Sequence, residues 1–110
     1  MIKLTAVLHA RADVSREEAL KYWKDVHGPL AADLPGIQRY VQTYCGEGAF
    51  GREEPPFLGI AEAWWTTREE AEIALQSEAF RIAFADTAKF LDVDNFQGGW
   101  CTELELVSNL

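Results

Sequence analysis

Apolar and polar residues alternate at the start of the chain, which is the pattern of a β-strand. Residues 2–10 place every second side chain on one apolar face: Ile2, Leu4, Ala6 and Leu8. The segments 37–45 and 57–65 follow prolines and are rich in β-branched and aromatic residues, so both are predicted strands. Alternation returns from Trp100 to Val107, which predicts a fourth strand near the end of the chain.

Apolar residues recur every three or four positions after residue 15, which predicts an amphipathic helix. Ser15 followed by Glu18 forms a capping box, so the helix is expected to begin there. Gly28 and Pro29 interrupt the apolar stripe, because proline lacks a backbone N–H and disfavours helical geometry in the residue before it. We therefore expect a kink or an end of this helix at His27.

A second helical region is predicted from Thr67 to about Leu91, and it opens with another capping box. Ser77 offers a further N-cap inside it, so two short helices or one helix with a break near Ser77 are expected. The stretches 46–56 and 92–99 lack periodicity and are predicted loops. The 46–56 loop is either a lid or a plain connection, and we favour the connection.

The resulting order is β-α-β-β-α-β, the pattern of a ferredoxin-like α+β fold. We expect a single domain over residues 1–110, with a four-stranded antiparallel sheet in the order four, one, three, two and both helices on one face. The other face carries apolar residues of strands one and three, including Val7 and Trp64. Such a face is not left in water, so a second copy of the chain is expected to cover it in a homodimer.

Composition narrows the classes of partner. The formal net charge is −8 and no cluster of lysine and arginine offsets it, so nucleic acid is not an expected partner. No apolar run approaches the roughly 18 residues of a membrane span, and no basic leader precedes an apolar segment. We therefore expect no membrane association and a cytoplasmic location.

The cysteines and histidines suggest neither a disulfide nor a metal. Cys45 and Cys101 are too few for a disulfide scaffold and would lie on opposite edges of the predicted sheet, so both thiols are expected to be reduced. His9 and His27 are far apart, and no cysteine or histidine has the spacing of a zinc site. No metal is expected, and His9 is predicted to be a surface residue.

His27 is the first candidate for chemistry. It lies in the apolar stripe of the first helix, where a hydrogen-bonded core histidine is common. A helix that ends at Gly28 would stabilise the imidazolium while burial opposes it, so the ring could titrate near neutrality as an acid or base. Position alone favours the core histidine, and the expected helix end shifts the balance towards a functional role.

One segment carries a more specific signal, from Glu17 to Gln42, reading EEALKYWKDVHGPLAADLPGIQRYVQ. It resembles the EthD family of the dimeric α/β-barrel superfamily, and the order of elements extends this resemblance over essentially the whole chain. The resemblance implies that two sheets pack face to face and enclose, in each subunit, a pocket for a small and often aromatic or lactone-like ligand. It also places His27 at that pocket, and related methylisomerase-type members imply a catalytic role for His27 and Tyr40.

Tyr40 and Gln42 share one face of the second strand, whereas Ile37, Val41 and Cys45 share the other. The more apolar set is expected to meet the helices, which leaves Tyr40 and Gln42 facing the pocket. A phenol there can donate a hydrogen bond to a carbonyl or a developing oxyanion. A tyrosine in the dimer interface is an equally good interpretation.

Weaker candidates for substrate binding are Glu62, Trp23 and Trp64, together with Gln42. Glu62 lies in an apolar strand, where its pKa would be raised so that it could act as a second base, or it is an interface charge. The tryptophans suit the walls of an aromatic site, but core packing is the favoured explanation for each of them.

Three functions compete. The first is a cofactor-independent enzyme in which His27 moves a proton next to a carbonyl while Tyr40 stabilises the enolate-like oxygen, as in isomerases and lyases. The second, implied by the resemblance, is an oxidoreductase or an accessory component of an oxygenase pathway, with His27 as a haem ligand or substrate base. The third is a non-catalytic protein that binds a hydrophobic metabolite. No cofactor is expected for the first.

Overall fold

The computed structural model describes all 110 residues, and its elements follow the predicted order. The strands are β1 (Ile2–Leu8), β2 (Arg39–Tyr44), β3 (Gly59–Trp65) and β4 (Gln97–Cys101). The helices are α1 (Arg16–Tyr22), α2 (Gly28–Ala32), α3 (Arg68–Leu75) and α4 (Glu78–Asp86). Short 3-10 turns follow at Thr87–Lys89 and Val93–Asn95.

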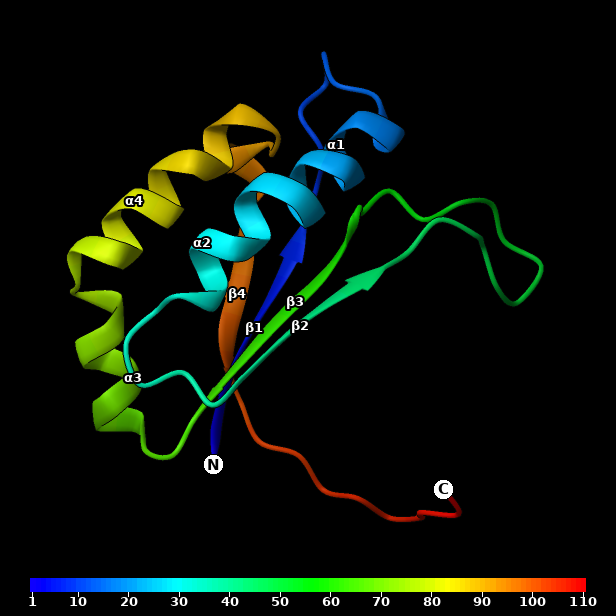
Figure 1. Cartoon of the computed structure of the whole chain (residues 1–110). Coiled ribbons are helices and arrows are strands. Elements are labelled where there is room, and N and C mark those ends of the chain that lie inside the picture. Colours follow the sequence, from blue (N-terminus) through cyan, green and yellow to red (C-terminus); the bar gives the residue numbers. More distant parts are fainter.

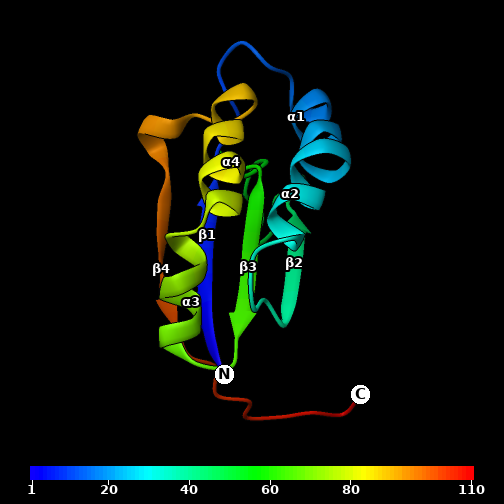
Figure 2. The ribbon, with the colours of Figure 1, turned by 60° about the vertical axis from the view of Figure 1, so that its left-hand side comes forward.

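The four strands form one antiparallel sheet in the order β2-β3-β1-β4, with all helices on one side of it (Figures 1 and 2). The central pair, β1 and β3, runs in a register that places Leu4 opposite Ala63. This arrangement confirms the predicted ferredoxin-like α+β fold and its strand order. Cys45 and Cys101 lie at opposite edges and are both free thiols.

Side-chain caps start the helices where the sequence predicts them. In each case the cap oxygen accepts a hydrogen bond from the backbone N–H three residues later, at Ser15, Thr67 and Ser77. The second helical region is therefore divided at Ser77 into α3 and α4, as predicted. No helix has the length and apolar character needed to cross a bilayer.

The chain stays helical beyond His27, so the helix does not end there, and the predicted interruption is a π-helical turn that ends at His27. A π-helical turn, Trp23–His27, joins α1 to α2, and the Gly28 backbone N–H donates to the Trp23 carbonyl. Pro29 lies in the first turn of α2, the part of a helix that best tolerates a residue without a backbone N–H. His27 is therefore not at a helix C-terminus, and the helix dipole gives its imidazolium no such support.

The last strand is also shifted, because β4 begins at Gln97 and ends at Cys101 instead of spanning 100–107. Cys101 pairs with Lys3, and β1 begins at Ile2, so later residues have no strand to pair with. Residues 102–110 leave the edge of the sheet without regular structure, and alternation alone did not reveal this (Figure 1).

The two faces of the sheet differ. The helix-covered face carries the core, whose largest fully buried side chains are Trp23, Trp65, Phe90 and Leu58. No helix covers the other face, which holds the ion pair between Lys3 and Glu62 at 2.7 Å. Val7, Val41 and Ile60 alternate onto that same open face, so it is apolar between its charges.

A glycine on β3 allows the first helix to approach the sheet. A Cβ atom at Gly59 would collide with the Thr43 carbonyl oxygen and lie 2.8 Å from the ring of Trp23. We predict that Gly59→Ala lowers the free energy of unfolding by about 1–3 kcal/mol, because the core is overpacked. Urea unfolding followed by circular dichroism measures this.

The control is Gly46→Ala, where a Cβ atom meets nothing within 4 Å. It should change the unfolding free energy by less than about 0.5 kcal/mol. Equal unfolding midpoints for the two variants would contradict the proposed close approach at Gly59.

Candidate active site

A cavity of about 110 Å³ lies between the helix-covered face of the sheet and the helices. Strands β1, β2 and β3 supply its floor, and the first helix and α4 supply its walls. Sixteen of its 19 lining residues are hydrophobic, and the exceptions are His27, Glu62 and Thr87. This cavity lies inside one chain, between the sheet and the helices. No residue of the 46–56 loop lines it.

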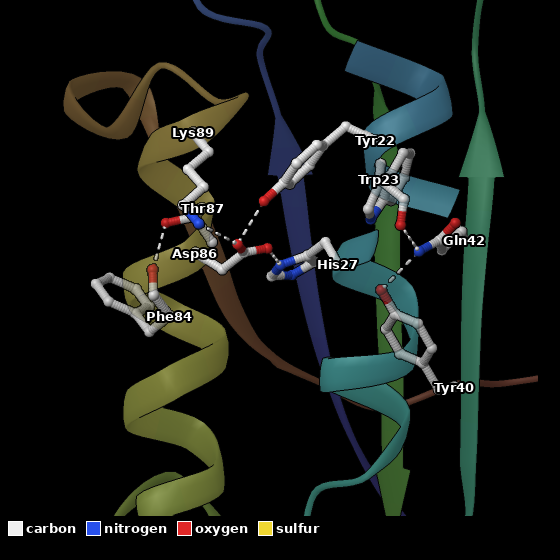
Figure 3. A network of polar contacts seen from close by, with 9 residues as sticks. All are labelled: Tyr22, Trp23, His27, Tyr40, Gln42, Phe84, Asp86, Thr87 and Lys89. Atoms are coloured by element: carbon white, nitrogen blue, oxygen red, sulfur yellow. Dashed lines mark hydrogen bonds and ion pairs between the residues drawn. The ribbon is translucent and has the colours of Figure 1, made fainter. Parts of the chain in front are cut away.

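His27 is held at this cavity by a buried carboxylate of α4. The His27 Nδ1 atom lies 3.1 Å from Asp86 Oδ2, and the Tyr22 hydroxyl donates to Asp86 Oδ1 at 2.6 Å (Figure 3). Asp86 is only 7% exposed. Because a carboxylate only accepts, Nδ1 carries the imidazole proton and Nε2 is left with its lone pair. No group of the chain hydrogen-bonds to Nε2.

Burial sets the protonation of these groups. It lowers the pKa of His27, and the hydrogen bond and charge of Asp86 only partly oppose this, so the imidazole is neutral at pH 7. Burial, with help from Asp86, raises the pKa of Tyr22 to about 12, so that phenol remains a donor. The arrangement is a neutral imidazole whose free nitrogen can accept a proton.

Tyr40 and Gln42 face the helices, so the predicted orientation of β2 is wrong. Gln42 Nε2 donates to the Trp23 carbonyl at 3.0 Å and to the Tyr40 hydroxyl oxygen at 3.1 Å (Figure 3). The Tyr44 hydroxyl donates to Gln42 Oε1 at 2.6 Å. Tyr44 also packs edge-on against Trp23. A tyrosine can bury its ring and keep its hydroxyl hydrogen-bonded, so the face of β2 with Tyr40 and Tyr44 packs inward although it has fewer aliphatic residues.

This reorientation still brings Tyr40 to the cavity, together with His27. Burial raises the pKa of Tyr40 despite the hydrogen bond from Gln42 and a donor interaction with Trp23. The phenol is therefore protonated at neutral pH. Its oxygen accepts from Gln42, and its own O–H finds no acceptor in the chain, so it is free to donate to a ligand.

The π-helical turn explains how Gln42 reaches the first helix. The Trp23 carbonyl accepts from the Gly28 N–H and from Gln42. A Cβ atom at Gly28 would lie 3.0 Å from Gln42 Nε2 and 3.2 Å from the Trp23 carbonyl oxygen. A larger residue would push Gln42 away, so glycine is required by this contact.

The other predicted substrate-binding residues are divided between the faces. Trp23 is fully buried and lines the cavity, and its indole N–H makes no hydrogen bond of ordinary geometry. The Glu62 backbone contributes to the floor, but its carboxylate pairs with Lys3 on the open face. Trp64 lies on the open face too, stacked against Arg39, with its indole donating to Glu103 at 2.9 Å. Strand alternation thus keeps Glu62 and Trp64 apart from His27.

Sequence reasoning missed Asp86, Tyr22 and Thr87. Asp86 falls at helical spacing from Ala83 and Phe90, both buried, so a charged residue within an apolar stripe was the available signal. Thr87 lines the cavity, but its hydroxyl donates to the Phe84 carbonyl at 2.6 Å. Tyr22 gave no signal. No group of three or more metal-ligating side chains is present.

Comparison with known families identifies the chain. The EthD domain family matches residues 11–94, which is most of the sequence. The chain belongs to the EthD family. The resemblance drawn from the segment around His27 is thereby confirmed. No curated protein sequence matches this EthD protein.

Solved structures share its fold at low identity. An ethyl tert-butyl ether D family protein from Bacillus halodurans superposes with a TM-score of 0.80 at 19% identity, covering 94% of this chain and 99% of that one. A cofactor-independent oxygenase from Streptomyces nogalater gives a TM-score of 0.64 at 12% identity, with 96% and 95% covered. A dimeric protein with a ferredoxin-like fold from Bacteroides fragilis gives 0.64 at 11%, with 91% and 93% covered.

The lowered pKa of His27 predicts a pH-dependent stability. The unfolded chain binds a proton at His27 near pH 6.5, whereas the folded protein does so only at lower pH. The free energy of unfolding thus decreases as the pH falls from 6.5 towards the pKa of His27 in the folded protein. For one proton this decrease cannot exceed about 1.4 kcal/mol per pH unit. Urea unfolding at a series of pH values between 5 and 8 measures it.

His27→Gln should remove that part of the slope, and His9→Gln should keep it. An unchanged slope in His27→Gln would show that the imidazole is not buried in its neutral form.

Proposed function

We propose that this EthD protein is a cofactor-independent enzyme that moves a proton on a small carbonyl, lactone or aromatic compound. One observation carries the proposal: a neutral imidazole, fixed by a buried carboxylate, presents a free nitrogen to an apolar cavity that also holds an unpaired phenol O–H. A base and a hydrogen-bond donor in one dry cavity are what proton transfer next to a carbonyl requires.

In this mechanism the ligand carbonyl oxygen accepts a hydrogen bond from Tyr40. His27 Nε2 removes a proton from the adjacent carbon, and the O–H of Tyr40 stabilises the enolate oxygen. The imidazolium that forms is stabilised by Asp86, 3.1 Å from Nδ1. Return of the proton to another atom completes an isomerisation, and departure of a leaving group completes an elimination.

Asp86 is a positioning residue in this proposal. It fixes the tautomer of His27, and Tyr22 occupies the second carboxylate oxygen, so the carboxylate cannot rotate freely. Lys89 lies 3.8 Å from Asp86 Oδ1 and adds a partly exposed counter-charge. His27 and Asp86 are thus fixed relative to each other by residues of two elements, the first helical region and α4.

A cofactor-independent oxygenase is the second candidate, because the cofactor-independent oxygenase from Streptomyces nogalater shares this fold. It would use the same proton abstraction to make an electron-rich carbanion. The haem variant of the oxidoreductase hypothesis does not fit, since a cavity of about 110 Å³ is much smaller than a haem group.

We also propose that the protein is a homodimer in which the open sheet faces of two copies pack together to form a barrel. The apolar side chains between the charges of that face support this, as do two neighbours described as dimeric, from Bacteroides fragilis and Thermobifida fusca. The pocket stays within each chain, so the dimer would rigidify the floor of the site.

Proton transfer can be tested before the substrate is known. In D₂O the protein should accelerate exchange of the α-protons of cyclohexanone, a small neutral ketone, as followed by ¹H NMR. His27→Gln should reduce this rate by about 10²–10⁴-fold, the usual contribution of a general base. Tyr40→Phe should reduce it less, because one hydrogen bond is lost while the base remains.

Asp86→Asn separates positioning from a merely structural effect. It should lower the rate and shift the apparent pKa of its pH profile to lower values, because the charge that supports the imidazolium is gone. His9→Gln is the matched histidine control and should retain full activity. Equal exchange rates for the wild type and His27→Gln would exclude His27 as the base.

The dimer is tested by placing a charge on the open face. Ile60→Lys should raise the dimer dissociation constant at least about 100-fold, because it buries an unpaired ammonium in the interface. Ile73→Lys makes the same change on α3, where the side chain is 67% exposed, and should have no effect. Sedimentation velocity over a concentration series measures both, and a monomeric wild type would contradict the dimer.

A further inference from the structure

We infer that the cavity selects uncharged compounds of at most one ring that carry a carbonyl or hydroxyl group, and that it rejects carboxylates of the same size. The inference rests on the proposed function in taking this cavity as the substrate site. It adds the charge and size of the ligand, which neither the family nor the fold specifies.

No positive charge faces the cavity. Its 19 lining residues include no lysine or arginine. The groups that can meet a ligand are the neutral imidazole of His27 and the O–H of Tyr40, because the indole N–H of Trp23 is fully buried. A ligand therefore finds one donor and one base, but no counter-ion.

The charges just beyond the lining do not supply one. Lys3 lies on the opposite face of the sheet, and its ammonium is bound to Glu62 at 2.7 Å. Lys89 is 69% exposed and lies 3.8 Å from Asp86, so its charge is already offset. Asp86 itself stands behind His27 and is negative, so it repels an anion in the cavity.

Desolvation explains why the absence of a counter-ion excludes carboxylates from the cavity. A carboxylate that leaves water for an apolar site loses its hydration and needs a cation or several strong donors in return. Tyr40 offers a neutral donor only, and burial lowers the pKa of His27, so the imidazole is not a ready cation. A neutral carbonyl loses far less hydration, and the O–H of Tyr40 replaces its hydrogen bond.

The entrance strengthens the discrimination. Phe84 and Phe96 both line the cavity, are 49% and 40% exposed and pack edge-on with ring centroids 5.9 Å apart, so the cavity reaches the surface beside this pair of rings. Asp92 and Asp94 come just before Phe96, and the whole chain has a net charge of −8. An apolar opening beside acidic residues favours the entry of neutral molecules.

The size of the cavity limits the ligand. A dry engineered cavity of roughly 150 Å³ accommodates benzene. At about 110 Å³ this cavity suits one ring or less, with the opening beside the two phenylalanines taking any substituent.

Benzamide and benzoate test the inference, because they have nearly the same shape and differ in charge at pH 7. ¹⁵N-labelled protein is titrated with each and the tryptophan indole signals are followed, after assignment with single Trp→Phe variants. Benzamide should shift the signals of Trp23 and Trp65, which line the cavity, and leave that of Trp64 on the open face. Benzoate should bind at least about tenfold more weakly.

A charge at the entrance should reverse part of this preference. Phe84→Lys should narrow the ratio of benzamide to benzoate affinity, whereas Ile82→Lys should leave it unchanged. Ile82 is the matched control, since it lies on the same helix, is 45% exposed and does not line the cavity.

Three results would overturn the inference: equal binding of both probes at Trp23 and Trp65, no shift of either signal by benzamide, or benzoate binding that strengthens below pH 6 to match benzamide. The last would mean that His27 takes up a proton from water when benzoate binds and becomes its counter-ion. If the preference holds while cyclohexanone exchange does not depend on His27, the ligand class stands and the proposed catalysis fails, which describes a metabolite-binding protein.

Discussion

The buried carboxylate of Asp86 is the interaction on which the site depends. A carboxylate that is 7% exposed must have its oxygens satisfied, and here one binds His27 and the other binds Tyr22 (Figure 3). Both partners come from the first helical region, whereas Asp86 ends α4. The two hydrogen bonds that satisfy the Asp86 carboxylate therefore connect the first helical region to α4. They also fix the orientation of the His27 imidazole at the cavity.

Tyr40 is held in a comparable way on the other side of the cavity. The π-helical turn at Trp23–His27 and the absence of a side chain at Gly28 let Gln42 reach the first helix, and Gln42 also donates to the hydroxyl of Tyr40. π-helical turns are often found at functional sites, where they change the direction of individual groups. Here the turn lets Gln42 bond to both the Trp23 carbonyl and the hydroxyl oxygen of Tyr40, and the hydroxyl proton of Tyr40 stays free to donate.

The sheet separates two roles by the alternation of its side chains. One face of β1 and β3 supplies a small, apolar floor made of residues such as Ala61 and Ala63, which leaves room for a cavity. The other face carries Trp64 and the Lys3–Glu62 ion pair, and it suits contact with a second copy. Glu62 illustrates this separation: its backbone borders the cavity, whereas its carboxylate binds Lys3 on the opposite face.

The sequence by itself determined the order of elements, the strand arrangement, the caps at Ser15 and Ser77 and the motif around His27, because these depend on local periodicity and on neighbouring residues. It did not determine the extent of β4, which is limited by where β1 begins. Nor did the sequence reveal which face of β2 meets the helices. Both faces of this strand mix apolar and polar residues, and only packing against Trp23 decides between them. The pairing of His27 with Asp86 joins residues 59 positions apart, and only the tertiary structure brings such distant groups within hydrogen-bonding distance.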